Sequence, residues 1–399
     1  MLAPFRSDYC KSCEIVTPDD GYHYFFGYYD LRADDGNGKY LCHRTSFWDR
    51  LPTKDDEIEV GYVENKQFFP IGKTTAWNFQ QGALLQYHPT EKDTVFYNVF
   101  LDGTPRTVKH NYVTGEKTYT DRAVATISPD GKYGIAVNFG RIYDFRPGYG
   151  YAGCADPFRD VAAPHEDGAF LVDMETGRST QILFYDTLGV ASGFAKEEKV
   201  LINHVNFNTT GDRYVMLVRN APLGECAGAK WSTSMVIGDL NGNVKTVLKN
   251  TGVSHYIWAN ADELIVFAKV NEKFGDWRIN VVTGEMEEYD VNFREDIHCN
   301  LSPNGQYLIG DSYPVDENNG YLHIDTFPAC GYRRVVAYSI KTKKPVILFD
   351  ALTTIISPNL DIRCDLHARF TEGGKYISYD TTQNGKRQIA KVSTEALNF

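Results

Sequence analysis

Short apolar segments recur along the chain in pairs, and a few turn-forming residues separate the two members of each pair. The turn at residues 128–131 (SPDG) is typical, and residues 302–305 (SPNG) repeat it. Proline presets φ for such a turn, and glycine adopts the positive φ that other residues resist. The pattern predicts seven β-hairpins, which begin at His23, Gly82, Ala125, His204, His255, His298 and Leu366.

A second pair of strands is expected between successive hairpins. Turn signals such as residues 112–115 (YVTG), 172–177 (VDMETG) and 281–284 (VVTG) mark these pairs. Repeated units of four short strands are typical of propeller blades. The sequence therefore predicts an all-β fold, a single seven-bladed β-propeller that spans residues 1–399 as one domain.

Composition agrees with strands, because aromatic residues make up 14% of the chain and favour extended backbone. No segment has sustained helical periodicity, so few helices are expected, with one short helical turn within residues 186–199. Two stretches stand out from the repeat, and loop insertions are expected near residues 45–67 and 139–168. Long loops on a rigid scaffold often carry function.

The formal net charge is −11, and no run of Lys or Arg is present. A nucleic-acid partner is not expected, because such proteins usually present a basic patch. A few arginines and histidines could still bind an acidic sugar. No apolar run is long enough to span a membrane, and the N-terminal residues lack a signal-peptide pattern. A cytoplasmic location without a membrane partner is expected, and the oligomeric state is left open.

Four consecutive units carry a histidine near the start of their first strand, namely His204, His255, His298 and His367. The first strand of a propeller blade lines the central channel, so equivalent side chains should point into one space. Neutral imidazoles are common ligands of first-row divalent metals. Asp365 would lie on the same strand face as His367 and add a carboxylate. The pattern predicts a metal or catalytic site; the alternative is that the histidines only form hydrogen bonds within their blades.

Arginines and aromatic residues near the predicted inner strands extend this candidate site. Arginine suits bidentate recognition of a carboxylate, and aromatic rings stack on sugar faces. The segment RPGYGYAG from Arg146 and the segment that holds Gln80 and Gln81 are candidate opposite walls of the channel. The candidate substrate-binding residues are Tyr29, Asp30, Trp77, Gln80, Gln81, Arg146, Tyr149, Tyr151 and Arg369.

Three segments carry a resemblance to a known family: HVNFNTTGDR from His204, HCNLSPNGQYLIGDSYP from His298 and CDLHARFTEGGKYISYD from Cys364. In them the chain resembles the propeller-type oligogalacturonate lyases and their wider WD40-like and TolB-like relatives. The N-terminal motifs YHYFFGYYD and TTAWNFQQG resemble a distinct subgroup of bacterial proteins.

The resemblance implies a divalent metal in the channel, Mn²⁺ in that family, bound by several histidines and a glutamine. Carried over by motif, it implies His255, His298 and His367 as metal ligands. The chain departs from the family at Asp365, where the family has a second histidine, and no glutamine stands on that strand.

The resemblance also implies catalytic residues. His204 would be the base, and Arg219 or Arg141 would face the carboxylate of the substrate. The implied partner is an acidic oligosaccharide.

Three functions are compatible with these residues. The first is a lyase that acts by β-elimination on a uronic-acid-containing saccharide, with the carboxylate neutralised by a metal or arginine and the proton taken by a neutral histidine. The second is a glycoside hydrolase, which needs two carboxylates, for which Asp30, Asp311 and Asp365 are candidates. The third is a non-catalytic propeller that binds a glycan or a protein.

Overall fold

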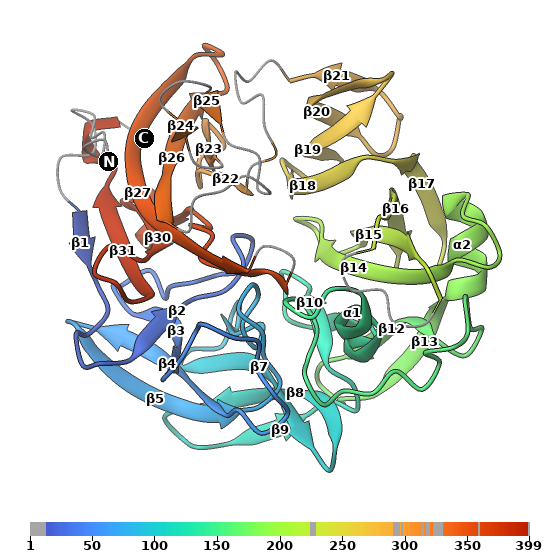
Figure 1. Ribbon diagram of the computed structural model, residues 1–399, viewed down its shortest axis with the longest axis horizontal. Helices are drawn as coiled ribbons and strands as arrows, with labels where there is room; N and C mark the ends of the chain where they lie inside the picture. The colour runs from blue at the N-terminus through green and yellow to red at the C-terminus, as the bar shows by residue number, and fades with distance from the viewer. Residues whose placement is uncertain are drawn as a thin grey trace.

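The structure is a computed structural model, and it describes residues 13–223, 229–289, 296, 298–312, 315–316, 320–321, 330–357 and 360–397. In this part of the chain, six four-stranded sheets and one five-stranded sheet stand in a ring around a central axis (Figure 1). The paired strands within each sheet are antiparallel. This arrangement confirms the predicted all-β class and the seven-bladed β-propeller.

Four blades come from the first part of the chain. The first contains β2 (His23–Phe25), β3 (Tyr40–Thr45), β4 (Ile58–Glu64) and β5 (Gln67–Thr74). The second contains β6 (Gln86–Tyr87), β7 (Thr94–Leu101), β8 (Thr104–Asn111) and β9 (Lys117–Tyr119). The third contains β10 (Val124–Ile127), β11 (Tyr133–Ala136), β12 (Gly168–Asp173) and β13 (Ser179–Phe184). The fourth contains β14 (Lys199–Phe207), β15 (Arg213–Ala221), β16 (Thr233–Asp239) and β17 (Val244–Thr251).

Three blades complete the ring. The fifth contains β18 (Val253–Trp258), β19 (Glu263–Val270), β20 (Lys273–Asn280) and β21 (Met286–Glu288). The sixth contains β22 (His298–Leu301), β23 (Tyr307–Asp311), β26 (Cys330–Ser339), β27 (Pro345–Ser357) and β28 (Ile362–Arg363), and β24 (Val315–Asp316) pairs with β25 (Gly320–Tyr321) beside it. The seventh contains β29 (Arg369–Thr371), β30 (Tyr376–Thr381), β31 (Gln388–Ser393) and β1 (Cys13–Ile15).

Each predicted hairpin supplies the first two strands of one blade, and the shared turn chemistry explains why. Gly131 has φ of +77° and donates its N–H to the Ser128 carbonyl at 2.8 Å. The Ser128 hydroxyl accepts the Tyr133 N–H at 3.0 Å, which fixes the start of the second strand. Ser302 accepts the Tyr307 N–H in the same way at 2.9 Å. Local sequence therefore sets each hairpin before any blade packs on another.

Helices are few in the described residues, as expected. Helix α1 (Phe139–Phe145) lies in the insertion predicted at 139–168, and α2 (Tyr185–Ser192) overlaps the helical turn predicted within 186–199. Two short 3-10 helices, η3 (Glu372–Gly374) and η4 (Glu395–Leu397), lie in the seventh blade. None of the described helices has the length and apolar character needed to cross a bilayer.

The insertion predicted at residues 45–67 is shorter than expected. Residues 58–64 form β4, whose alternating buried and half-buried side chains make it a regular strand of the first blade. Only the stretch between β3 and β4 is a loop connection, so the prediction was wrong for the C-terminal part of this range.

The two ends of the chain close the ring together. β1 pairs with β31 as the outer strand of the seventh blade, with Cys13 opposite Val392 and Ile15 opposite Ala390. The Val16 N–H then donates to the Ile389 carbonyl at 3.0 Å. Val16 and Ile389 are buried in one apolar cluster with side chains of the first blade. The first and last blades are therefore joined both by a strand pair and by a shared core.

We expect Val16→Asp to lower the free energy of unfolding by about 2–4 kcal/mol, because it places a charge in the core that closes the ring. Urea denaturation followed by tryptophan fluorescence measures this change. The matched control is Val113→Asp, whose side chain is 69% exposed, and which should change stability by less than about 0.5 kcal/mol. Equal stability of the two variants would contradict this account of closure.

Candidate functional site

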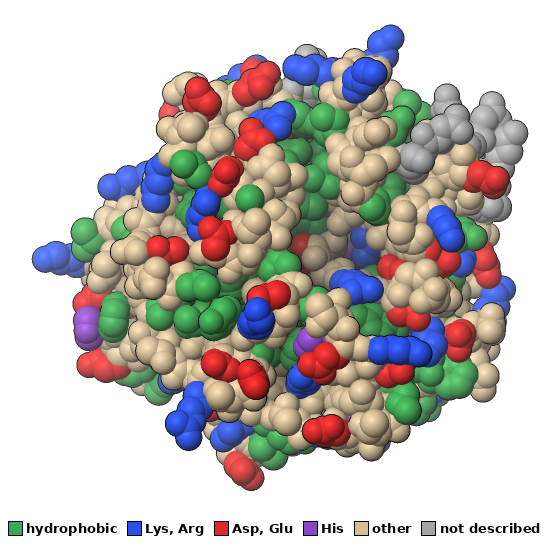
Figure 2. Space-filling view, turned by 180° about the vertical axis from the view of Figure 1, so that it is seen from behind, with side chains coloured by type: hydrophobic (Ala, Val, Ile, Leu, Met, Phe, Trp, Pro, Cys, Tyr) green, Lys and Arg blue, Asp and Glu red, His purple; other side chains and the backbone are tan. Residues whose placement is uncertain are grey.

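A cavity of about 500 Å³ lies beside the channel, where the fourth and fifth blades meet the loop after β2 and the segment after α1. Figure 2 shows the face opposite to that of Figure 1, which is hollowed near its centre and has acidic and basic side chains interspersed around the hollow. The cavity brings together many of the predicted site residues, namely Tyr29, Asp30, Arg146, Tyr149, His204, Arg219 and His255.

His204 reaches the cavity because β14 is interrupted at this residue. Its φ is +61°, which is strained for a residue other than glycine, and the register with β15 shifts between Asn203 and Val205. The Gln81 side-chain amide nitrogen lies 3.3 Å from Nδ1 of His204 and can only donate to it. The neutral ring therefore carries its own proton on Nε2. Burial, together with the nearby charges of Arg219 and Arg146, holds the pKa of His204 well below its usual value.

His255 has the opposite tautomer. Its Nδ1 lies 2.7 Å from the Asp296 carboxylate, which can only accept, so the proton of the neutral ring is on Nδ1. The lone pair is then on Nε2. Burial lowers the pKa of His255, and the Asp296 carboxylate opposes that shift. His255 is thus a neutral imidazole with a free lone pair at the wall of the cavity.

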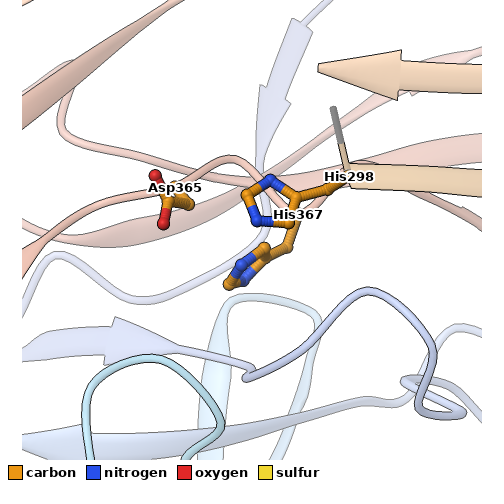
Figure 3. A group of neighbouring side chains, drawn as sticks. All are labelled: His298, Asp365 and His367. Atoms are coloured by element: carbon orange, nitrogen blue, oxygen red, sulfur yellow. The ribbon is translucent and has the colours of Figure 1, made fainter. Parts of the chain in front are cut away.

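His298 and His367 form an enclosed pair (Figure 3), with ring centroids 4.4 Å apart, and the His255 ring lies 4.2 Å from that of His298. Nδ1 of His298 donates to the Asp311 carboxylate at 2.9 Å, and Nδ1 of His367 donates to the Gly27 carbonyl at 2.7 Å. Both Nε2 atoms therefore carry lone pairs. Both are buried and lack a hydrogen-bond partner among the described residues. Partnering of Nδ1 with a free Nε2 is the usual state of metal-binding histidines.

Asp365 lies next to this pair, and one ligand atom from each of His298, Asp365 and His367 falls within 4.8 Å of the others. Two guanidinium groups already bind its carboxylate, Arg363 at 2.7 Å and Arg333 at 2.5 Å. Burial raises the pKa of Asp365, but these two cations more than offset it and hold the pKa well below its usual range. The carboxylate is ionised and compensated, so the two imidazoles are the better donors for a metal.

The same ion pairs continue to the cavity. Arg363 binds Asp361 at 2.5 Å as well as Asp365, and Asp361 accepts two hydrogen bonds from Arg146 at 2.6 and 3.1 Å. Arg333, Asp365, Arg363, Asp361 and Arg146 thus alternate in charge between the enclosed histidine pair and the cavity wall. The chain of ion pairs holds Arg146 in place, and Asp361 compensates its charge.

Arg219 differs from the other buried arginines in having no carboxylate partner. The arginines buried in the described part of the chain are Arg141, Arg219, Arg333, Arg363, Arg369 and Arg387. All but Arg219 pair with an aspartate, at distances between 2.5 and 3.3 Å. Arg219 is 4% exposed, and no carboxylate of a described residue lies within ion-pair distance.

Within the described part of the chain, no acidic side chain compensates the charge of Arg219. Its Nη1 donates to the Asn203 side-chain oxygen at 2.6 Å, and its Nε is buried without a partner. Burial, followed by repulsion from Arg146, lowers the pKa of Arg219 to about 10. A buried unpaired charge costs free energy that a bound anion would return. Arg219 lines the cavity, so the anion would arrive there.

Tyr28 lies between His204 and the pair formed by His298 and His367. Its ring stacks on His204 at a centroid distance of 4.9 Å, and it meets the ring of His367 edge-on at 4.9 Å and that of His298 at 5.8 Å. The rings of His255, His298 and His367 follow one another at centroid distances of 4.2 and 4.4 Å, so three of the four histidines are contiguous. His204 and His255 line the cavity, whereas His298 and His367 lie behind Tyr28 and Tyr29.

Four predicted site residues lie outside the cavity lining and have structural roles. Arg141 donates to the carbonyls of residues 158, 161, 162 and 200, which fixes the insertion after α1. Trp77 is fully buried and donates to the Asp56 carbonyl at 2.8 Å. The Tyr151 hydroxyl accepts from Asn98, and Arg369 pairs with Asp380. These contacts engage most of their polar groups, and none of the four is among the residues that line the cavity.

The two predicted glutamines lie behind the cavity wall. Gln81 orients His204, as described above. The Gln80 amide nitrogen donates to the Asp361 carbonyl at 3.0 Å, while its oxygen is buried without a hydrogen-bond partner. Neither is among the residues that line the cavity.

Of the carboxylates considered for hydrolysis, only Asp30 lines the cavity. Asp30 is exposed at the cavity, but the surrounding protein excludes much of the water. This desolvation raises the pKa of Asp30 to about 6, although a hydrogen bond from Asn206 opposes the rise. Asp311 is bound by His298 and by the His367 N–H, and Asp365 is bound by its arginines. A pair of free carboxylates on opposite sides of a bound sugar is therefore not formed by the predicted residues.

Several residues that line the cavity were not predicted, among them Asp296, Tyr28 and Trp231. Asp296 precedes His298 by two residues, as Asp365 precedes His367, and this repeated D-x-H spacing could have indicated it. Tyr28 is the direct neighbour of the predicted Tyr29. Trp231, which is 43% exposed at the cavity, has no local signal, because only the packing of the fourth blade against α1 brings it there.

We expect opposite results when Arg141 and Arg219 are each replaced by methionine, which has a similar length and no charge. Arg141→Met leaves Asp156 with a single cation, Lys199 at 3.5 Å, and frees several buried carbonyls, so stability should fall by about 3–5 kcal/mol. Arg219→Met removes an unpaired buried charge and should change stability by less than about 1 kcal/mol. Urea denaturation followed by circular dichroism measures both, and equal losses would contradict this difference.

Comparison with known proteins supports the fold. No family model matches the chain, and no curated protein matches it. An oligogalacturonate lyase in complex with manganese superimposes with a TM-score of 0.63 at 14% identity, covering 98% of this chain and 96% of that one. An oligogalacturonate lyase from Vibrio parahaemolyticus gives a TM-score of 0.62 at 14% identity, with the same coverage of 98% and 96%.

A prolyl endopeptidase gives a TM-score of 0.50 at 9% identity and covers 94% of this chain but only 48% of its own length. The similarity to the two lyases instead extends over nearly the whole of each chain. The resemblance predicted from the hairpins at His204, His298 and Cys364 is confirmed at the level of the fold, because the chain and the two oligogalacturonate lyases share a propeller fold.

Proposed function

We propose that this protein is a lyase that cleaves a uronic-acid-containing oligosaccharide by β-elimination in the cavity beside its channel. The observation that carries the proposal is the buried Arg219, which has no ion-pair partner among the described residues, in a cavity that also holds a neutral histidine with a free lone pair. The cation would neutralise the carboxylate of the sugar, and the histidine would remove the proton beside it. The shared fold with oligogalacturonate lyases supports the same reaction class.

The two tautomers favour His255 as the base, in place of His204. Nε2 of His255 would take the proton from the carbon that bears the carboxylate, and the electrons of that C–H bond would form a carbon–carbon double bond. The bond from the next carbon to the glycosidic oxygen would break, and its electron pair would leave with that oxygen, which takes a proton from the solvent. His204 presents an N–H, which suits a hydrogen bond to the substrate.

His298 and His367 fit a divalent metal, because their buried Nε2 lone pairs have no other partner. These two residues would hold it, with Asp365 nearby as a compensated carboxylate. A bound divalent cation would supply positive charge that stabilises the carboxylate as negative charge builds on it. His255 is not part of this group of three, although its ring lies 4.2 Å from that of His298, and we propose the role of base for it in place of the ligand role that family resemblance suggests.

The direct assay incubates the protein with a panel of oligouronides, beginning with oligogalacturonides, in the presence of Mn²⁺. The unsaturated product is measured by its ultraviolet absorbance. We expect product with the wild-type protein, and a fall in kcat of about 10²–10⁴-fold for His255→Ala, because the base is lost. The matched control is His165→Ala, whose imidazole is 64% exposed and far from the cavity lining, and which should retain full activity.

Absence of ultraviolet product with every uronide would contradict the lyase proposal. New reducing ends without such product would indicate hydrolysis instead. Saccharide binding without any cleavage would indicate a non-catalytic propeller.

Metal binding can be measured separately by isothermal titration calorimetry with Mn²⁺. Because each histidine supplies one donor, His298→Ala and His367→Ala should each weaken binding by about 100-fold or more. His204→Ala should leave the affinity within about threefold, because the partner of its Nδ1 is Gln81 and its ring lies across Tyr28 from the enclosed pair. Equal effects of all three variants would contradict the separation of His204 from the metal-binding pair.

A further inference from the structure

Two aromatic side chains are exposed at the cavity although large apolar groups are elsewhere mostly buried. Trp231, just before β16, is 43% exposed, and Phe274, on β20, is 56% exposed. Both line the cavity that contains Arg219 and His255. Exposed tryptophan is frequent where a protein contacts a ligand that has both polar and apolar surfaces.

Both rings are held in position by their neighbours. The Trp231 ring meets Phe145 edge-on at a centroid distance of 5.1 Å. The Phe274 ring stacks on Phe267 at 5.8 Å, with 16° between the planes, and lies over Gly252. A Cβ at Gly252 would come within 2.6 Å of the Phe274 ring, so the glycine makes room for it. Rings held by packing lose little freedom when a ligand stacks on them.

Trp231 lies next to Arg219, the buried arginine without an ion-pair partner among the described residues. The guanidinium of Arg219 lies 5.5 Å from the centre of the Trp231 ring, and that of Arg146 lies 5.6 Å from it. Lys230 adds a further cation to the cavity lining. A saccharide whose carboxylate binds Arg219 therefore places the next sugar ring within reach of the indole. The combination of an aromatic face and cations fits a chain of acidic sugars better than a single one.

We propose that Trp231, with Phe274 beyond it, forms a stacking surface for sugar rings adjacent to the uronate bound at Arg219, so that the site selects oligouronides by chain length. This inference rests on the proposed function for the identity of the ligand. Pyranose rings present C–H groups to the electron-rich face of an aromatic ring, and each further ring that stacks adds apolar contact. Affinity should therefore rise from a monouronide to a trimer.

Binding can be measured by isothermal titration calorimetry with galacturonate, digalacturonate and trigalacturonate, on the His255→Ala background so that no ligand is consumed. Loss of the stacking face in Trp231→Ala should weaken binding of the trimer by about tenfold or more, and should leave the monomer within about twofold. Trp231→Phe keeps a ring and should recover most of the trimer affinity. Phe274→Ala should weaken the trimer more than the dimer.

The matched control is Tyr119→Ala. Tyr119 is also aromatic and 42% exposed, but it lies on β9, outside the cavity. This variant should bind every ligand as tightly as the parent protein does. Circular dichroism verifies that each variant is folded. Equal losses for monomer and trimer in Trp231→Ala would overturn the proposal, because the indole would then act only by supporting the arginines. Unchanged trimer binding would overturn it as well. The lyase proposal fails separately, if the wild-type protein gives no product that absorbs in the ultraviolet. That result does not depend on how binding changes with chain length.

Discussion

The antiparallel pair between β1 and β31 fixes the geometry on which the site depends, because it closes the ring of blades (Figure 1). The loop after β2 projects Tyr28 and Tyr29 across the channel to histidines of the fourth to seventh blades. These contacts join residues that are far apart in the chain. These contacts form only if the first and last blades stay together. The strand pair and the apolar core that contains Val16 join these two blades.

Within that frame, compensation of buried charge determines which residues are available for chemistry. The channel is desolvated, so a charged or polar group there needs a partner. The chain of ion pairs from Arg333 to Arg146 meets this requirement, and so do the Nδ1 contacts of His255, His298 and His367. Among the described residues, Arg219 and the Nε2 atoms of His255, His298 and His367 are groups that remain for a ligand, a metal or a proton.

The sequence was sufficient for the fold and for part of the site. Hairpins depend on local turn chemistry, as at Ser128 and Gly131, so their number and position could be predicted. The roles of individual residues could not, because they depend on partners from other blades. Arg141 and Arg219 are both arginines near inner strands, and only the folded chain gives Asp156 to one of them and no carboxylate to the other. Likewise, the tautomer of His204 depends on the distant Gln81.

The central claim is that Arg219 is left unpaired to receive the carboxylate of a sugar. Calorimetric titration of the wild-type protein and Arg219→Met with digalacturonate and with its neutral methyl ester tests it most directly. The account predicts that the wild-type protein binds the acid at least about tenfold more tightly than the ester, and that this preference disappears in Arg219→Met. Equal affinity for acid and ester in the wild-type protein, or an undiminished preference in the variant, would contradict it.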